Sequence, residues 1–224
     1  MDMHAFHKLT YGLYIISTAS QGQYSGCVVN TLVQVTASPI QVSVAINKDN
    51  YTEQMIEKAG VFSAAALTQD AGMDLIGEFG FKSSRETDKF ASFAYEKEAN
   101  GIPYVTEHVA AQLSCRVVNK MDVGSHVLFI AEVTDAQVLS EGELLTYGYY
   151  QTVKKGGTPK NASSYQAEPA PAAQGQTGYR CSVCGYILES DTIPEGFRCP
   201  ICGQGPDKLV KLSSPILPAR ILIT

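Results

Sequence analysis

Apolar residues recur in short segments along most of this chain. Six segments are rich in β-branched and aromatic residues and are bounded by Gly, Ser or Pro, which is typical of β-strands. Within one of them, polar Gln112 and Ser114 alternate with apolar Leu113 and Cys115, as expected for a strand with one buried face. The predicted strands cover residues 11–19, 27–36, 40–46, 61–67, 111–121 and 126–139.

Two segments have helical character. Residues 51–59 follow Asn50, a suitable N-cap residue, and residues 71–79 carry an apolar side chain at every third position. Many strands with few helices to cross between them favour an antiparallel barrel over a doubly wound sheet. The sequence has no Gly-x-Gly-x-x-Gly after a strand, which argues against a Rossmann dinucleotide site.

A change in composition separates two unlike parts of the chain. Residues 156–178 contain no Val, Ile, Leu, Phe or Met, so this stretch cannot bury enough surface to fold alone. We expect residues 1–166 to form one domain, 167–178 a flexible linker, and 179–212 a second domain too small for a core of its own. The first half of the polar stretch could still lie along the first domain, with Tyr165 as an anchor. The apolar residues 213–224 form a tail of unknown role.

Charge and length narrow the functional classes. The 224 residues carry a formal net charge of −5 and a sequence pI of about 5.4, which argues against a nucleic-acid-binding protein. No stretch approaches the 18 or so consecutive apolar residues of a membrane span, and the N-terminus does not resemble a secretory signal. Two close cysteine pairs and the lone thiols Cys27 and Cys115 favour a reducing, cytoplasmic location.

The two close pairs predict a metal site. Cys181, Cys184, Cys199 and Cys202 have the spacing Cys-x2-Cys-x14-Cys-x2-Cys, in which two sulfurs from each turn can converge around one ion. Thiolates suit zinc or iron, and a structural zinc ion is the commoner use of this spacing.

The residues around the cysteines favour iron. Gly185 and Gly203 follow the two pairs and can adopt the positive φ that aims backbone N–H groups at sulfur. With Tyr186, Phe197 and Pro200, the motif resembles rubredoxin over about 35 residues, although Phe197 replaces the usual tryptophan and the loop between the pairs is short. The resemblance implies one iron in an Fe(Cys)4 site that carries single electrons.

The first domain resembles flavin reductase-like proteins with an FMN-binding split barrel. The similarity lies in residues 10–56, in GSHVLFIAEV (124–133) and in KGGTPKNASSY (155–165); Ser125 and Ala131 depart from the family pattern. The fold class that this implies is mainly β: an FMN-binding split β-barrel with a few helices, joined to a small rubredoxin-like iron-binding domain.

The resemblance implies sites for the flavin and its phosphate. Backbone and side chains of Val29, Asn30, Thr31 and Leu32 are expected to bind the edge of the ring. Asn47, Lys48, Asn50 and Thr52 precede or begin a helix whose N-terminus would attract a phosphate. Lys89 could face the flavin or its phosphate, and His126 could act beside the flavin or nicotinamide. Each group also has a plainer interpretation. Residues 29–32 could be an ordinary barrel strand and residues 47–52 an ordinary capped helix start, while Lys89 could lie in a solvated loop and His126 could be structural.

The combined pattern resembles the flavoprotein–rubredoxin fusions of anaerobic bacteria. It implies an NAD(P)H oxidoreductase that passes electrons through FMN to iron and then to a flavodiiron protein, and it implies a homodimer. A free-flavin reductase with a structural zinc ribbon, and a flavin–iron carrier reduced by another protein, remain alternatives. The sequence does not distinguish NADH from NADPH.

Overall fold

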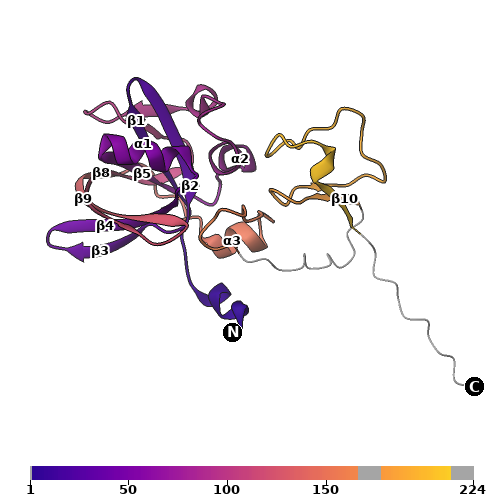
Figure 1. Cartoon of the computed structure of the whole chain (residues 1–224), viewed down its shortest axis with the longest axis horizontal. Coiled ribbons are helices and arrows are strands. Elements are labelled where there is room, and N and C mark those ends of the chain that lie inside the picture. The colour runs from indigo at the N-terminus through magenta and orange to yellow at the C-terminus, as the bar shows by residue number, and fades with distance from the viewer. Residues whose placement is uncertain (1, 166–177, 213–224) are drawn as a thin grey trace, which may run out of the picture.

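A computed structural model describes residues 2–165 and 178–212 and shows a β-barrel followed by a small C-terminal domain (Figure 1). Most of the predicted linker and the whole predicted tail lie outside the described residues. Gly178, the last residue of the predicted linker, instead begins strand β10 (Gly178–Cys181) of the C-terminal domain. The first half of the polar stretch, up to Tyr165, lies along the barrel as the sequence suggested.

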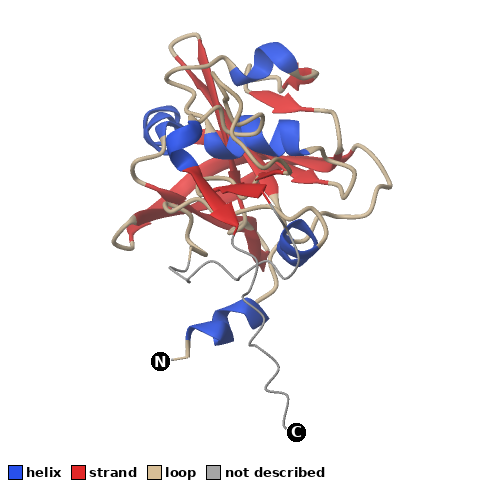
Figure 2. Ribbon diagram, turned by 90° about the vertical axis from the view of Figure 1, so that its right-hand side faces the viewer, coloured by secondary structure: helices blue, strands red, loops and turns tan. Residues whose placement is uncertain are grey.

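The barrel is one antiparallel sheet of seven strands in the order β2-β1-β5-β8-β9-β4-β3, with short helices outside it (Figure 2). Bulges in the β8–β9 pair, between Ser114 and Cys115 and between Val117 and Asn119, bend the two longest strands around the core. The strand bounds are β1 Tyr14–Ser20, β2 Gln23–Val29, β3 Val33–Ala37, β4 Ile40–Asn47, β5 Val61–Leu67, β8 Val109–Asp122 and β9 His126–Val138.

Alternation along the strands divides the apolar side chains between two cores. Ile16 and Phe62 point to one face, where they meet Val44 and Phe129 from the far half of the sheet. Ile15, one residue from Ile16, points to the other face. There it belongs to a cluster with side chains of helix α2 and with Leu145 and Tyr150 from the last part of the barrel domain. The first core is the barrel interior, because strands from both halves of the sheet contribute to it.

The mainly β prediction is confirmed, but the segment 27–36 is not one strand. The chain leaves the sheet after β2 at one edge and re-enters it as β3 at the other edge. Thr31 lies in the crossing: its hydroxyl donates to the carbonyl of Ala45 at 2.8 Å and accepts the N–H of Ala45 at 3.2 Å. The Thr31 hydroxyl thus makes the hydrogen bonds to Ala45 that the backbone of a neighbouring strand would otherwise make. The β-propensity of the residues alone does not predict this break in the strand.

The helices follow their end signals. Helix α1 (Tyr51–Ala59) has the predicted bounds, with the Asn50 side chain accepting the N–H of Thr52 and Gly60 ending the helix at φ 70°. Helix α2 (Met73–Phe81) begins two residues later than predicted, because Gly72 is extended and caps it. The sequence did not predict helix α3 (Tyr147–Thr152). Within the described ranges, no helix is long and apolar enough to cross a membrane.

Smaller elements complete the barrel domain. A two-stranded ribbon, β6 with β7, covers one side of it, and short 3-10 helices lie at the N-terminus and after α2. Their bounds are η1 Met3–Lys8, η2 Lys89–Ser92, β6 Tyr95–Lys97 and β7 Pro103–Val105.

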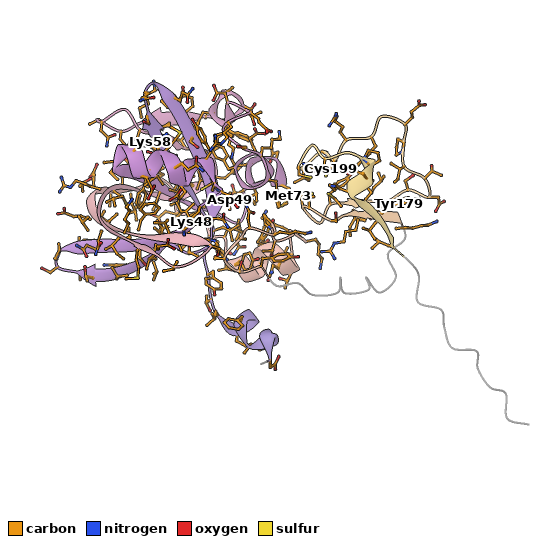
Figure 3. All side chains as sticks on the ribbon, in the orientation of Figure 1. Lys48, Asp49, Lys58, Met73, Tyr179 and Cys199 are labelled. Atoms are coloured by element: carbon orange, nitrogen blue, oxygen red, sulfur yellow. The ribbon has the colours of Figure 1, made fainter. Side chains whose placement is uncertain are left out.

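The C-terminal domain is a three-stranded sheet in the order β11-β10-β12 (β11 Ile187–Leu188, β12 Leu209–Leu212), with a 3-10 turn η3 (Pro206–Lys208) before its last strand. Its core consists of the four buried cysteines of the predicted metal site. Figure 3 labels Cys199 in this core and Met73 of α2 on the side of the barrel that faces it.

Candidate functional site

Four buried cysteine sulfurs meet in the C-terminal domain. All four Sγ atoms lie within 4.8 Å of one another, with Cys181 and Cys202 at 3.6 Å and Cys184 and Cys199 at 3.4 Å. A tetrahedral ion with metal–sulfur bonds of about 2.3 Å separates its sulfurs by about 3.8 Å. The four residues therefore fit one tetrahedral thiolate-bound ion.

Each cysteine pair lies in a tight turn that aims backbone donors at sulfur. We call residues 181–186 the first knuckle and 199–204 the second knuckle. Gly185 and Gly203 have φ values of 81° and 71°, in the left-handed region that glycine adopts without strain. The N–H groups of the following residues, Tyr186 and Gln204, then interact with the sulfurs of Cys184 and Cys202. Such donors stabilise the more negative, reduced state of an iron–thiolate site, as the two glycines led us to expect.

Apolar side chains surround the sulfurs. Tyr186, Phe197 and Ile201 pack against the cysteine cluster from within the C-terminal domain. Phe81, the last residue of α2, packs against the same cluster from the barrel. The metal site is thus in contact with the first domain as well as its own.

A cavity opens in the barrel where β2 ends. Apolar walls come from Leu13, Ile76 and Tyr147, and polar groups come from the ends of β2, β4 and β9. Its border consists of Leu13, Val28, Val29, Asn30, Thr31, Ala45, Ile46, Asn47, Asn50, Ile76, Gly80, Phe81, His126, Tyr147, Tyr150 and residues of the segment 157–164. A flat ring with acceptors and a donor on its edge suits such a site, so the residues present fit a flavin.

The structure brings six of the predicted flavin residues to this cavity. They share a position at strand ends or at the start of α1: Val29, Asn30, Thr31, Asn47, Asn50 and His126. Asn47 and His126 are direct partners in the β4–β9 register, so two segments far apart in sequence place their side chains at one edge.

Four predicted residues do not border the cavity. Leu32 packs against the barrel interior, and the Thr52 hydroxyl is buried against that of Ser25 at 2.8 Å. The Lys48 ammonium, labelled in Figure 3, pairs with Asp122 at 2.6 Å. Lys89 is 3% exposed and donates to the carbonyls of Gly26 and Phe79 at 2.8 and 3.2 Å; burial lowers its pKa to about 8. The Lys89 ammonium therefore already donates to backbone carbonyls outside the cavity border.

His126 has the setting of a neutral imidazole. Partial burial lowers the pKa of His126, and its Nδ1 lies 2.8 Å from the Ser125 hydroxyl. Ser125, which departs from the family pattern, thus contacts the histidine ring directly. A neutral ring keeps one donor and one acceptor at the cavity.

Residues 157–164, which we call the strap, close one side of the cavity. Asn30 donates to Ser164 at 2.9 Å and accepts from Ser163 at 3.3 Å, while Asn47 donates to the carbonyl of Asn161 at 3.0 Å. The opposite end of the strap is held by α3, where the Tyr150 hydroxyl donates to the Gly157 carbonyl at 2.8 Å. Burial raises the pKa of Tyr150, which keeps this hydroxyl protonated.

Sequence reasoning missed two aromatic residues of this site. Tyr147 and Tyr150 lie three residues apart on α3, stack with an interplanar angle of 24°, and both border the cavity. Their spacing in TYGYYQT is the only available signal, and it is weak because no apolar periodicity accompanies it.

A cation does lie at the start of α1, though not one of the two predicted lysines. The Arg85 guanidinium is 4.6 Å from the centroid of the Tyr51 ring and donates to the Gln54 side chain. It reaches there from the loop after α2, in which Ser84 accepts the N–H of Gly26 at 3.2 Å. The start of α1 therefore combines the positive charge of Arg85 with the N-cap residue Asn50, which also borders the cavity.

Comparisons with known proteins match the barrel to a flavin reductase family and the C-terminal domain to a rubredoxin-like family. Residues 6–156 match the family described as flavin reductase like domain, and residues 179–209 match the rubrerythrin, rubredoxin-like domain. The chain is 40% identical to the high molecular weight rubredoxin of Moorella thermoacetica over 92% of this chain and 98% of that protein. It is 42% identical to a ferric-chelate reductase (NAD(P)H) of Archaeoglobus fulgidus over 74% of this chain and 98% of that protein.

The fold comparison points the same way. The flavin reductase PheA2 is 29% identical and superimposes with a TM-score of 0.55 over 64% of this chain and 88% of its own. The matched ferric-chelate reductase, aligned over 165 residues, corresponds in length to the barrel domain alone.

Proposed function

Because the chain belongs to the flavin reductase-like family, is a homologue of high molecular weight rubredoxin and ends in a rubredoxin-like domain with a four-cysteine site, we propose that it passes electrons from NAD(P)H through FMN to iron. One observation carries the proposal: Phe81 borders the cavity at the end of β2 on one side and packs against the cysteine cluster on the other. The two sites are thus adjacent, as an electron relay requires.

A bound flavin accepts two electrons as a hydride and can release them singly, whereas a thiolate-bound iron takes one at a time. The chain's own residues supply position and environment. The apolar walls from Leu13 and Ile76 exclude water. Asn30 and Asn47 each donate one amide hydrogen to the strap, which leaves the second hydrogen of each amide for the ring edge. His126, held neutral, offers a hydrogen bond without adding charge. Asn50 and Arg85 at the start of α1 suit the FMN phosphate.

A flavodiiron protein is the acceptor that the family resemblance implies, and we propose it as the partner. The C-terminal domain is the natural donor to such a partner, because its single metal site is the end of the chain of electron carriers. A truncated chain that ends at Tyr165 is expected to oxidise NAD(P)H with an artificial acceptor but not to reduce the partner. Support for activity of the barrel alone comes from the ferric-chelate reductase relative, which has that length.

We also propose a homodimer, on the basis of exposed apolar side chains. Every residue of the edge strand β3 is exposed, including Val33 at 56%, and Ile40, which pairs with β3 from the start of β4, is exposed as well. An uncovered edge strand with apolar side chains is a template for pairing. Val35→Lys on β3 is expected to convert a dimer to a monomer in light scattering. A wild-type mass of one chain would refute this part of the proposal.

Anaerobic titration of the purified, metal-loaded protein with NADH and with NADPH tests the main proposal. Flavin absorbance should bleach first and the ferric thiolate band afterwards, with no second protein present. Metal analysis should give one iron per chain. Zinc instead of iron, or bleaching of flavin without bleaching of the thiolate band, would favour a free-flavin reductase with a structural zinc. An unbleached flavin would favour a carrier reduced by another protein.

A further inference from the structure

Two glycines of the barrel domain lie where the cysteine knuckles touch it. A Cβ atom on Gly77, inside α2, would lie 2.7 Å from the carbonyl oxygen of Ile201 and 2.9 Å from its Cγ2. A Cβ atom on Gly157, at the start of the strap, would lie 2.7 Å from the carbonyl carbon and oxygen of Cys184. Ile201 belongs to the second knuckle and Cys184 to the first. Both knuckles therefore approach the barrel more closely than any side chain would allow.

The contact also includes a directed hydrogen bond. The Gly157 N–H donates to the Cys184 carbonyl at 3.0 Å. On the knuckle side, an atom at the Cβ position of Gly185 would lie 3.2 Å from the Gly157 nitrogen. Backbone meets backbone here, which fixes the first knuckle against the strap.

The position of Gly77 is unusual for a helix. Glycine in a helix interior is destabilising relative to alanine, yet Gly77 lies in the middle of the nine residues of α2 and is buried. The close approach of Ile201 gives a reason for it, because alanine would collide with a backbone carbonyl. One turn later, Phe81 fills the space between the cavity and the cysteine cluster. In Figure 1, α2 lies on the side of the barrel that faces the C-terminal domain.

From these contacts we infer that the barrel carries a built docking seat for its own C-terminal domain, formed by Gly77, Phe81 and Gly157, and that electrons cross from the cavity to the cysteine site in this docked position. The inference rests on the proposed function and adds the contact surface to it. A reduced flavin held at the cavity would give one electron across the seat, and this electron would reduce a ferric ion held by the four cysteines to the ferrous state. The second electron would follow once the proposed acceptor protein had taken the first from the iron. The covalent linker keeps the docked partner at high effective concentration, so a small seat suffices.

The seat can be broken at Gly77 in the full-length, metal-loaded protein. Gly77→Leu places a branched side chain against Ile201, and Gly77→Asp places a charge at the same contact. Asp74→Ala is the matched control, because Asp74 lies on α2 but is exposed. The structural readout is small-angle X-ray scattering of the oxidised protein, and the kinetic readout is the stopped-flow rate of iron reduction after flavin reduction.

Both seat variants are expected to show a larger radius of gyration than wild type and at least a tenfold slower iron reduction. Flavin reduction by NAD(P)H and iron content should stay unchanged, which shows that both domains are folded. Agreement between the two variants guards against a local folding defect in one of them. An unchanged radius in both, or an unchanged rate of iron reduction with an enlarged radius, would overturn the inference. If wild type itself fails to reduce its flavin with NAD(P)H, the proposed function fails, while the scattering comparison still decides the docking.

Discussion

The barrel and the C-terminal domain are stabilised in different ways, and the difference decides how each combines folding with function. The barrel has two clusters of buried apolar side chains, and its cavity lies at strand ends beside them. The C-terminal domain has one cluster, built on the four sulfurs that also hold the metal. In the barrel, stability and function use largely different residues; in the smaller domain they use the same atoms.

The largest expected effect is the loss of the metal. Cys199→Ser should abolish metal binding and unfold residues 178–212, because structural metal binding contributes on the order of 10 kcal/mol to small thiolate domains. The barrel should keep its thermal transition. Hydrogen exchange resolved by segment, together with metal analysis, measures both regions in one sample.

Cys115→Ala is the matched control for that variant. Cys115 is a lone buried thiol in the barrel interior, and burial raises its pKa to about 12, so it is an inert apolar group. Its removal should destabilise the barrel slightly and leave the metal content intact. If Cys199→Ser lowered the barrel transition as strongly as it unfolds the small domain, the two regions would not be separately stabilised.

A core truncation should produce the reverse pattern. Phe129 on β9 is fully buried in the barrel interior, and Phe129→Ala should lower the free energy of unfolding of the barrel by about 3–5 kcal/mol. The ferric thiolate band should survive at temperatures where the barrel has melted. Val138→Ala, on the exposed end of the same strand, should change the barrel transition by about 0.5 kcal/mol or less. A simultaneous loss of the thiolate band with Phe129→Ala would contradict the comparison.

The same contrast explains what could be predicted from sequence. The metal site was predictable as a set, because its four ligands and both glycines lie in two local turns. The barrel strands and α1 were also predictable, since alternation, a capping Asn50 and a terminal Gly60 are local signals. Thr31 shows the limit of such local signals. Its hydroxyl bonds the backbone of Ala45, 14 residues away, where a neighbouring strand would otherwise pair. The segment predicted as one strand is therefore two strands at opposite edges of the sheet.

Side-chain direction in the barrel was less predictable than residue position. Lys89 and Lys48 were reasonable candidates for a phosphate, but one is taken up by backbone carbonyls and the other by Asp122. Arg85 reaches the start of α1 only because the loop after α2 folds over it. Such choices depend on contacts between segments far apart in sequence, which residue spacing does not encode.

Because Lys89 is buried, the stability of the barrel should depend on pH in the alkaline range. Burial lowers the pKa of Lys89 from 10.5 to about 8, so between these values the unfolded chain binds the proton and the folded barrel does not. Stability from this residue is therefore fully present above pH 10.5 and is lost as the pH falls through 8. Wild type should gain stability between pH 8 and 10 relative to Lys89→Met, in denaturant unfolding of the barrel. Lys58→Met, at an exposed position on α1, should keep the wild-type slope. Parallel curves for wild type and Lys89→Met would contradict this.

The smallest expected effect is a change of stability between pH 7 and pH 4.5. As the pH falls, the contribution of Glu53 to barrel stability should rise, while the C-terminal domain should lose stability. Burial and the neighbouring Glu57 raise the pKa of Glu53 from 4.5 to about 6, so the folded barrel holds this proton more tightly than the unfolded chain. Barrel stability from Glu53 is therefore greatest below pH 4.5, and it falls as the pH rises to about 6. Thiolate ligands, in contrast, bind metal less well as the pH falls. Glu53→Gln should stabilise the barrel at pH 7 by about 1 kcal/mol, allowing for solvent screening, with no gain at pH 4.5. Urea unfolding at both pH values, with exposed Glu141→Gln as the control, measures this difference. A gain of equal size at both pH values would mean that packing, and not the charge of Glu53, causes it.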